Sequence, residues 1–382
     1  MRKREGILAF REKPGILLSK ELSPLKPVLF LMAAAAAVTV GAWGCCQYAF
    51  ASPRGRQNDD HALPPFDQLA PYRDKAHALI RRLNKLPWER VYITSYDGLR
   101  LAGRYYHTAD GAPLDICFHG YRGTPSRDFS GGAQMLLSMG HNVLLAEQRA
   151  QCGSQGRYIT MGVKERYDCL DWIRWGLDRF GPEVSIVLYG ISMGASTVLM
   201  ASGMDLPPNV KGVAADCPFT SPDAIVRSVL QSMHASALYP LLALGTRLFG
   251  GFSLKGADAA EAVGHARVPI LLIHGEDDRF VPCGMSRAIA AANPAAELHV
   301  FPGAGHGISF LTDEERYKTL LERFSRRVLG ELTRTAPARR CRGGPGVFQS
   351  SGSAAGKSRE NSGLISFSLR SRVTASSRAS SR

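Results

Sequence analysis

A serine between glycines is the first feature of this sequence that could do chemistry. Residues 190–194 read G-I-S-M-G, the pattern G-x-S-x-G, and the apolar run 184–189 leads straight into them. Where a strand turns tightly into a helix, the serine hydroxyl is pushed out above the sheet, and Gly190 and Gly194 leave room for the turn. We therefore expect Ser192 to be a nucleophile. The alternative is a glycine-rich turn in which this serine only caps the following helix.

A serine hydroxyl needs a base to take its proton and an acid to orient that base. Both should stand on loops that follow late strands. The apolar run 298–301 leads into a loop that carries His306, and the run 270–273 leads into a loop with three consecutive acids. We expect His306 to be the base. Asp278 is the expected acid, because the third acid lies deepest in the turn; the two before it should face solvent or cap local amides.

The negative charge that develops on a substrate oxygen requires two inward-facing amide N–H groups, an oxyanion hole. One should belong to Met193, the residue after the expected nucleophile. The other should come from the loop after the apolar run 114–118, where Tyr121 follows His119 and Gly120. A plain glycine-rich turn is the alternative interpretation of this loop.

Short apolar runs alternate with helical patterns from residue 90 onward, which predicts an α/β sheet. The central runs are continuously apolar, as expected when helices cover both faces of a parallel sheet. Eight strands are predicted at 91–95, 101–107, 114–118, 142–146, 184–189, 210–215, 270–273 and 298–301. The stretch 218–262 breaks the alternation with two apolar helical patterns. We interpret it as a lid over the site, with extra packing helices as the alternative.

These loops together resemble those of the α/β-hydrolase superfamily. The resemblance rests on F-H-G-Y-R-G at 118–123, G-I-S-M-G-A at 190–195 and H-G-x-x-D-x-x-V-P at 274–282, followed by Gly305-His306. It implies the α/β-hydrolase fold, with a mostly parallel eight-stranded sheet, helices on both faces and a small helical lid. The spacing of the third motif also selects Asp278. More narrowly, the chain is similar to bacterial hydrolases with one N-terminal membrane segment, grouped with monoacylglycerol lipases, esterases and serine aminopeptidases.

One further loop resembles that family less closely. Residues 147–156 follow its D-x-R-x-H-G-x-S-x-G loop, but Glu147, Gln151 and Cys152 stand where Asp, His and Gly are usual. The resemblance implies a structural role for this loop.

The N-terminal region predicts a membrane segment. Residues 1–26 carry seven Lys or Arg against three acids, and the uncharged run 27–51 is long enough to span a bilayer as a helix. The positive-inside bias predicts a cytoplasmic N-terminus and an extracytoplasmic remainder. We expect an uncleaved signal-anchor; the alternative is a signal peptide cleaved near Ala51, where A-F-A fits the cleavage pattern. Residues 52–89 are interpreted as a linker and an approach helix.

The net charge of +14 lies at the ends of the chain. The predicted hydrolase domain, 90–333, is nearly neutral, so no nucleic-acid partner is expected. The Ser- and Arg-rich residues 334–382 are predicted to be a disordered basic tail. None of the eight cysteines forms C-x-x-C and no Cys/His cluster has zinc-ligand spacing, so we expect neither metal nor cofactor.

The sequence thus predicts a serine hydrolase that cleaves carboxylic ester or thioester bonds of a small or lipid-like acyl substrate through an acyl-serine intermediate. A serine aminopeptidase is the second hypothesis. It would need an acidic subsite for the substrate amine, and the lid offers only Asp223, Asp258 and Glu261. A catalytically idle scaffold that keeps the fold is the third hypothesis.

Overall fold

The computed structural model describes residues 25–52, 62–64 and 66–330 of the 382-residue chain. The predicted basic N-terminus up to residue 24, the middle of the linker and the predicted tail 334–382 lie outside the described residues. All structural statements below concern the described part of the chain.

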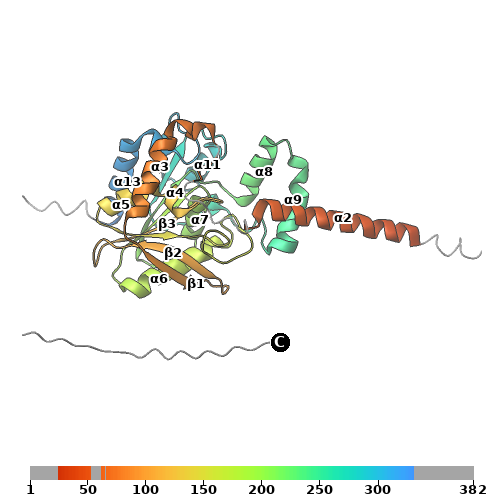
Figure 1. The fold of residues 1–382 in the computed structure, drawn as a ribbon, viewed down its shortest axis with the longest axis horizontal. Coiled ribbons are helices and arrows are strands. Elements are labelled where there is room, and N and C mark those ends of the chain that lie inside the picture. The colour runs from red at the N-terminus through yellow and green to blue at the C-terminus, as the bar shows by residue number, and fades with distance from the viewer. Residues whose placement is uncertain (1–24, 53–61, 65, 331–382) are drawn as a thin grey trace, which may run out of the picture. The chain divides into compact units, whose positions relative to one another are not determined.

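The core of the protein is one eight-stranded sheet with the order β1-β2-β4-β3-β5-β6-β7-β8 (Figure 1). β1 and β2 are antiparallel to their neighbours, and all the following pairings are parallel. The strands are β1 (Glu89–Thr94), β2 (Arg100–Tyr106), β3 (Leu114–Phe118), β4 (Asn142–Ala146), β5 (Ile186–Ile191), β6 (Val210–Asp216), β7 (Ile270–Gly275) and β8 (Glu297–Phe301). The prediction of a mostly parallel eight-stranded sheet is confirmed.

Helices cover both faces of the sheet, because successive side chains of its central strands point to opposite sides. Ile116 of β3 packs into one core cluster and the next residue, Cys117, into the other. The first face is covered by α6 (Glu165–Phe180), α7 (Met193–Ser202), α10 (Ala259–His265) and α11 (Gly284–Ala292). The second is covered by α3 (Arg73–Lys85), α5 (Ser130–Ser138) and α13 (Glu314–Val328). The α/β-hydrolase fold class follows from this arrangement.

A helical insertion lies between β6 and β7, where the sequence predicted two apolar helical patterns. It consists of α8 (Pro222–Ser232), η2 (Ser236–Leu238), α9 (Tyr239–Gly245) and η3 (Thr246–Gly250). Ser221 caps α8 by accepting a hydrogen bond from the Ala224 amide. The remaining short helices are η1 (Asp67–Tyr72), α4 (Pro125–Asp128) and α12 (Ser309–Thr312).

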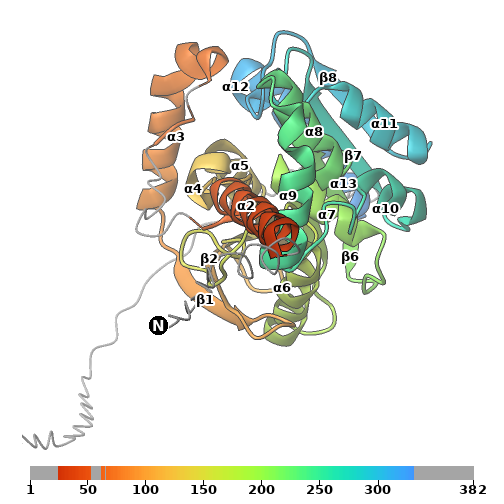
Figure 2. The same cartoon turned by 90° about the vertical axis from the view of Figure 1, so that its right-hand side faces the viewer.

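The N-terminal apolar run forms one long helix, α2 (Leu25–Phe50), which is long and apolar enough to cross a membrane. Residues 26–40 are exposed, whereas Ala42, Cys46 and Phe50 are buried. The buried end of α2 packs against α9 and η3, and both views show it beside the insertion (Figures 1 and 2). The C-terminal turns of this helix are therefore part of the folded domain.

The loop 147–156 has the structural role that its resemblance implied. Its Arg149 is buried and forms ion pairs with Asp168 and Asp97. Glu147, the residue in place of the usual Asp, pairs with Arg90 and accepts a hydrogen bond from the Gly153 amide. The longer side chain thus still closes the loop.

Candidate active site

Ser192 stands in the tight turn between β5 and α7. Its backbone has φ 55° and ψ −116°, a left-handed conformation that strains any residue other than glycine. The turn depends on two close backbone approaches. A Cβ on Gly190 would lie 2.3 Å from the Gly194 oxygen, and a Cβ on Gly194 would lie 1.8 Å from the Phe118 oxygen. Glycine is therefore required at both positions, as the sequence predicted for this turn.

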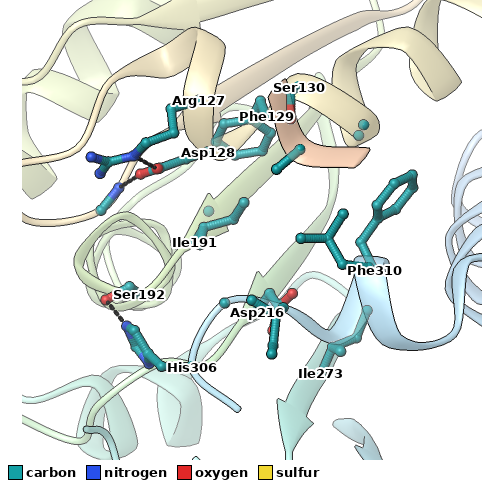
Figure 3. A pocket seen from close by; sticks show the side chains of 18 of the residues that line it. Arg127, Asp128, Phe129, Ser130, Ile191, Ser192, Asp216, Ile273, His306 and Phe310 are labelled. Carbon is teal, nitrogen blue, oxygen red and sulfur yellow. Dashed lines mark hydrogen bonds and ion pairs between the residues drawn. The ribbon is translucent and has the colours of Figure 1, made fainter. Parts of the chain in front are cut away.

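His306 joins Ser192 to Asp278 through two hydrogen bonds, and Figure 3 shows the bond between Ser192 and His306. Its Nε2 lies 2.9 Å from the Ser192 Oγ, and its Nδ1 lies 2.6 Å from the Asp278 Oδ2. A carboxylate only accepts, so Nδ1 carries the proton and Nε2 is left as the acceptor for the serine hydroxyl. The three residues come from the loops after β5, β7 and β8, and they meet at one edge of the sheet because parallel strands end there together.

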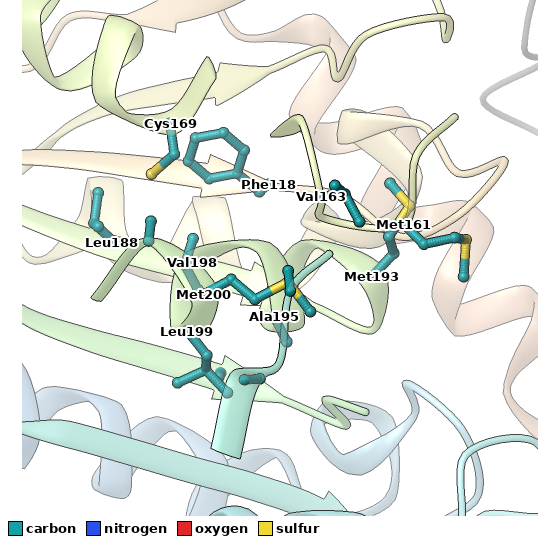
Figure 4. Close-up of a cluster of buried hydrophobic side chains, with 14 of the residues drawn as sticks. Phe118, Met161, Val163, Cys169, Leu188, Met193, Ala195, Val198, Leu199 and Met200 are labelled. Atoms are coloured by element: carbon teal, nitrogen blue, oxygen red, sulfur yellow. The ribbon is translucent and has the colours of Figure 1, made fainter. Parts of the chain in front are cut away.

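The burial of α7, the helix that follows Ser192, holds the serine turn in place. α7 begins directly after Ser192, and its residues 193–202 are all buried. Figure 4 shows Met193, Ala195, Val198 and Leu199 within the hydrophobic cluster that contains Phe118 of β3. A helix packed on all sides cannot relax, so it retains the strained geometry at its first turn.

Asp278 is buried and is held by four hydrogen-bond donors. Its Oδ1 accepts the amides of Phe280 and Val281 at 2.8 Å each. Its Oδ2 lies 2.6 Å from His306 and 3.3 Å from the Nε2 of His274. Burial alone would raise the pKa of the Asp278 carboxyl, but the hydrogen bonds from His274 and His306 outweigh it and hold this pKa well below its usual value. The carboxylate therefore stays ionised throughout the neutral range.

The neighbouring acids are placed differently. Glu276 and Asp277 are exposed, and their backbone amides bond to the Phe301 and Ala304 carbonyls. Among the described residues, only Asp278 of these three acids contacts His306.

The loop after β3 lies directly against Ser192. A Cβ on Gly120 would be 3.4 Å from the Ser192 Cβ. His119 is buried and fixes this loop: its Nδ1 donates to the Gly120 carbonyl, and its Nε2 accepts from the Gln148 amide at 3.1 Å. Burial lowers the pKa of His119, which keeps the ring neutral as this pattern requires.

The amides of Tyr121 and Met193, which the sequence predicted as oxyanion-hole donors, lie in the two loops next to Ser192. In the described part of the chain, neither amide donates to a backbone carbonyl. Met193 is the first residue of α7, so its N–H is one of the amides that a helix leaves unpaired. The Tyr121 side chain points away to the Ala49 carbonyl of α2, where its hydroxyl donates a hydrogen bond.

Asp216 is a site residue that the sequence reasoning did not single out. It ends β6, is buried, and its carbonyl accepts the Ser192 amide at 2.8 Å. Its Oδ1 has no hydrogen-bond partner among the described residues. Burial raises the pKa of Asp216 to about 6, with the nearby Asp278 charge acting in the same direction. Its only sequence signal is its place, one residue beyond an apolar run that ends at the same sheet edge as Ser192.

Two cavities of similar size, about 240 and 210 Å³, meet at Ser192. The larger one is mixed in character: Asp128, Asp216 and His306 line it together with Ile273 and Phe310 (Figure 3). The smaller one is apolar and lies between α2 and the insertion. Its lining includes Ala49, Phe219, Ile225, Leu230 and Val281.

Cys217, Asp278 and His306 form the one group of described side chains with metal-ligand spacing. Burial raises the pKa of the Cys217 thiol well above its usual value, so the thiol stays protonated and is a poor ligand. Asp278 and His306 are already bonded to each other. This cluster therefore does not have the chemistry of a metal site.

The chain matches the alpha/beta hydrolase family over residues 116–320, more than half of its length. It belongs to that family. The membership agrees with the expectation from the loops and makes the protein a hydrolase. Its placement in the subgroup of membrane-anchored bacterial enzymes stays a prediction.

Several proteins are similar to this hydrolase. It is 24% identical to the uncharacterized protein YqkD of Bacillus subtilis, over 66% of this chain and 83% of that one. It is 29% identical to the uncharacterized protein Rv2307c of Mycobacterium tuberculosis, over 61% and 78% of the two chains. Lysophosphatidylserine lipase ABHD12 of Danio rerio is 26% identical over 46% of each chain.

Among solved structures, the esterase Pf2001 of Pyrococcus furiosus superposes with a TM-score of 0.54 at 22% identity, covering 70% of this hydrolase and 96% of the esterase. The hydrolase GrgF of Penicillium sp. sh18 gives a TM-score of 0.51 at 19% identity, covering 64% and 100%. At these identities the superpositions show a shared fold.

Asp278→Asn should lower turnover of an ester substrate by about ten-thousandfold, because an amide favours the wrong tautomer of His306. Asp277→Asn and Glu276→Gln, which change exposed neighbours, should stay within about tenfold of wild type, equivalent to roughly 1.4 kcal/mol. The measurement is kcat on folded variants. An inactive Asp277→Asn beside an active Asp278→Asn would contradict the assignment.

Asp216 should make the stability of the protein fall as pH rises from about 4 to 6. In this window the folded protein binds a proton at Asp216 that the unfolded chain has already released, so rising pH favours unfolding. Two pKa units correspond to about 3 kcal/mol. Asp216→Asn removes the titrating group. Between pH 4 and pH 7, the free energy of unfolding measured in urea should therefore fall by about that much more in wild type than in the variant. Parallel pH curves for the two proteins would contradict the raised pKa of this buried carboxyl.

Proposed function

We propose that this protein is a serine hydrolase that cleaves carboxylic ester or thioester bonds through an acyl-Ser192 intermediate. The observation that carries the proposal is the hydrogen-bonded chain from the Ser192 hydroxyl through His306 to the buried Asp278 carboxylate. This chain supplies a nucleophile, a base with the correct tautomer and an acid that stays ionised.

In the acylation step, the Ser192 Oγ attacks the substrate carbonyl carbon while His306 Nε2 takes the hydroxyl proton. The negative charge moves to the carbonyl oxygen, where the amides of Met193 and Tyr121 donate hydrogen bonds. The tetrahedral intermediate then collapses: the bond to the leaving oxygen or sulfur breaks, and His306 returns the proton to it. Asp278 stabilises the imidazolium between these two transfers.

In the second step, water attacks the acyl-serine and repeats the sequence. His306 takes a proton from the water, the acid product leaves, and the proton returns to Ser192. The two cavities suit the two halves of such a substrate, since the apolar cavity can hold an acyl chain and the mixed cavity can hold a polar leaving group.

A peptidase that releases N-terminal residues is less well supported. Its site would need a free carboxylate to hold the substrate amine. Asp128 is paired with Arg127, Asp223 with Arg227, and Asp258 caps α10. Asp216 is buried, and its raised pKa leaves it partly protonated near neutral pH. The esterase Pf2001 and the lipase ABHD12, both named for ester hydrolysis, point in the same direction.

We also propose that the N-terminal helix remains attached as a signal-anchor, with the catalytic domain outside the cytoplasm. Cleavage after Ala51 would remove Cys46 and Phe50, whose side chains are 0% and 2% exposed. It would also remove hydrogen bonds that join the helix to the domain, including Gln47 Nε2 to the Tyr158 hydroxyl and the Ile159 amide to the Phe50 carbonyl. A segment discarded after export would not be expected to form part of the core.

A fluorophosphonate probe should label the full chain at Ser192, and Ser192→Ala should abolish the labelling together with esterase activity. The activity loss should be several powers of ten, because the three residues act as one unit. A panel of p-nitrophenyl acyl esters and aminoacyl-nitroanilides then separates the esterase from the peptidase. Labelling that survives in Ser192→Ala would reject the nucleophile, and preference for the anilides would reject the ester.

The mature protein purified from membranes should keep its N-terminal helix, and protease added to intact spheroplasts should reach the catalytic domain. N-terminal sequencing or intact mass gives the first result, and immunoblotting of the digest gives the second. A mature N-terminus at Ser52 would replace the anchor by a cleaved signal, and a protected domain would reverse the orientation.

A further inference from the structure

The apolar cavity beside Ser192 has an unusual wall. Four of its lining residues, Cys45, Tyr48, Ala49 and Phe50, belong to the last turns of α2, the helix that is apolar enough to cross a membrane. The opposite wall is formed by α8 and the segment that follows it, through residues such as Leu230 and Met233. A cavity that reaches the nucleophile is thus completed by the expected anchor.

The contact between α2 and the insertion is tight enough to be a fixed wall. A Cβ on Gly245 of α9 would lie 2.2 Å from the Ala42 carbonyl, so the two backbones approach as closely as glycine allows. Phe50 and Phe252 stack edge to face at 5.4 Å. On the domain side, Arg122 donates to the Tyr48 carbonyl at 2.7 Å. These contacts fix α2 along one side of the cavity.

The exposed length of α2 indicates the depth of this cavity in a bilayer. Residues 26–40 are exposed and would extend about 22 Å as a helix, which is less than the roughly 30 Å of hydrocarbon that a span must cross. Lys26 marks the charged end of the span. The missing length of about five residues brings the outer hydrocarbon boundary to the level of Cys45 and Cys46, where the lining of the cavity begins.

The side chains around the mouth of the cavity are apolar or aromatic, as expected at the boundary of a bilayer. Tyr48, Met233 and Leu238 line the cavity and are also exposed, so they mark its mouth. Leu248 of η3, which packs beside α2, is 58% exposed, and Trp43 of α2 is 46% exposed. Exposed Leu, Trp and Tyr side chains around the end of an apolar helix are typical of a membrane interface.

We infer that α2 is one wall of the acyl pocket and holds its mouth in the outer leaflet, so that the enzyme takes its substrate directly from the bilayer. The substrate class is an ester of one long acyl chain with a polar alcohol. The apolar cavity beside Ser192, about 210 Å³, suits one chain, and the mixed cavity with Asp128 and His306 suits the polar alcohol. This inference rests on the proposed function and names the substrate of that same site.

The test uses the full chain reconstituted in phosphatidylcholine vesicles, with p-nitrophenyl butyrate and p-nitrophenyl palmitate as probes. Rates are divided by the concentration of sites that a fluorophosphonate labels, and the readout is the ratio of palmitate to butyrate hydrolysis. Loss of labelling and of both activities would therefore concern the proposed function, whereas a change in the ratio alone concerns the pocket.

Ala49→Phe, which fills the cavity from the α2 side, should lower the palmitate-to-butyrate ratio at least tenfold. Val38→Phe, on an exposed part of the same helix, is the matched control and should leave the ratio within twofold. If Ala49→Phe does not label, Cys45→Phe replaces it, because Cys45 lines the same wall. If Ala49→Phe or Cys45→Phe is labelled and its palmitate-to-butyrate ratio is unchanged, α2 is not a wall of the acyl pocket.

Leu248→Asp tests the depth, because Leu248 lies outside the cavity lining and should contact lipid. It should lower the ratio at least fivefold by lifting the mouth from the hydrocarbon, and Tyr92→Asp on β1 is the control on an exposed strand at the edge of the sheet. If Leu248→Asp and Tyr92→Asp have the same palmitate-to-butyrate ratio, the mouth of the cavity lies outside the membrane. That result would contradict the inference that the substrate enters from the bilayer.

Discussion

The turn at Ser192 is the constraint on which the other features of the site depend. It brings the start of α7 so close to the end of β3 that no side chain fits at Gly194, and it holds Ser192 in a conformation that an unconstrained residue avoids. The strain persists because α7 is buried over its whole length. Because α7 begins directly after this turn, the Met193 amide has no intrahelical partner. The position of Ser192, its orientation and the free amide beside it therefore all depend on this turn.

Around this turn, the protein separates apolar from polar surroundings. On one side of Ser192 the lining is almost free of polar atoms, and on the other side the carboxylates of Asp128 and Asp216 line the cavity, with Asp278 close by behind His306. The burial of Asp278 is compensated by four donors, which hold its pKa low, whereas Asp216 has fewer donors, chiefly the Tyr317 hydroxyl, and its pKa lies near 6. Two buried aspartates near one histidine thus differ in pKa through hydrogen bonding.

Much of the fold could be predicted because parallel strands buried on both faces leave continuous apolar runs. The eight predicted runs correspond to the eight strands, and runs 114–118 and 142–146 have the observed bounds. The loop residues could be placed because strand ends fix which loops meet. Asp278 could be selected among three acids because the turn geometry buries only the last of them. These inferences all rest on local patterns whose consequences are local.

The sequence did not predict features that depend on contacts between segments far apart in the chain. Asp216 follows an apolar strand like any strand-ending acid, and nothing local marks it as buried beside His274 and Tyr317. The partial burial of α2 was also missed, because residues that face lipid and residues that face protein are equally apolar. The small residues at 41–46 were the available signal, since they permit close helix packing.

The tight packing of α2 against the domain has a consequence for the rate at which the enzyme meets its substrate. An enzyme that is tethered to a membrane by a flexible linker samples many distances from the membrane and many orientations. Here the hydrogen bonds of Gln47 and Phe50 and the backbone contact at Gly245 leave no joint between the helix and the described domain. With α2 in a bilayer, the protein keeps only lateral translation and rotation about the membrane normal. Encounters with a lipid then become two-dimensional, and their frequency depends on surface density.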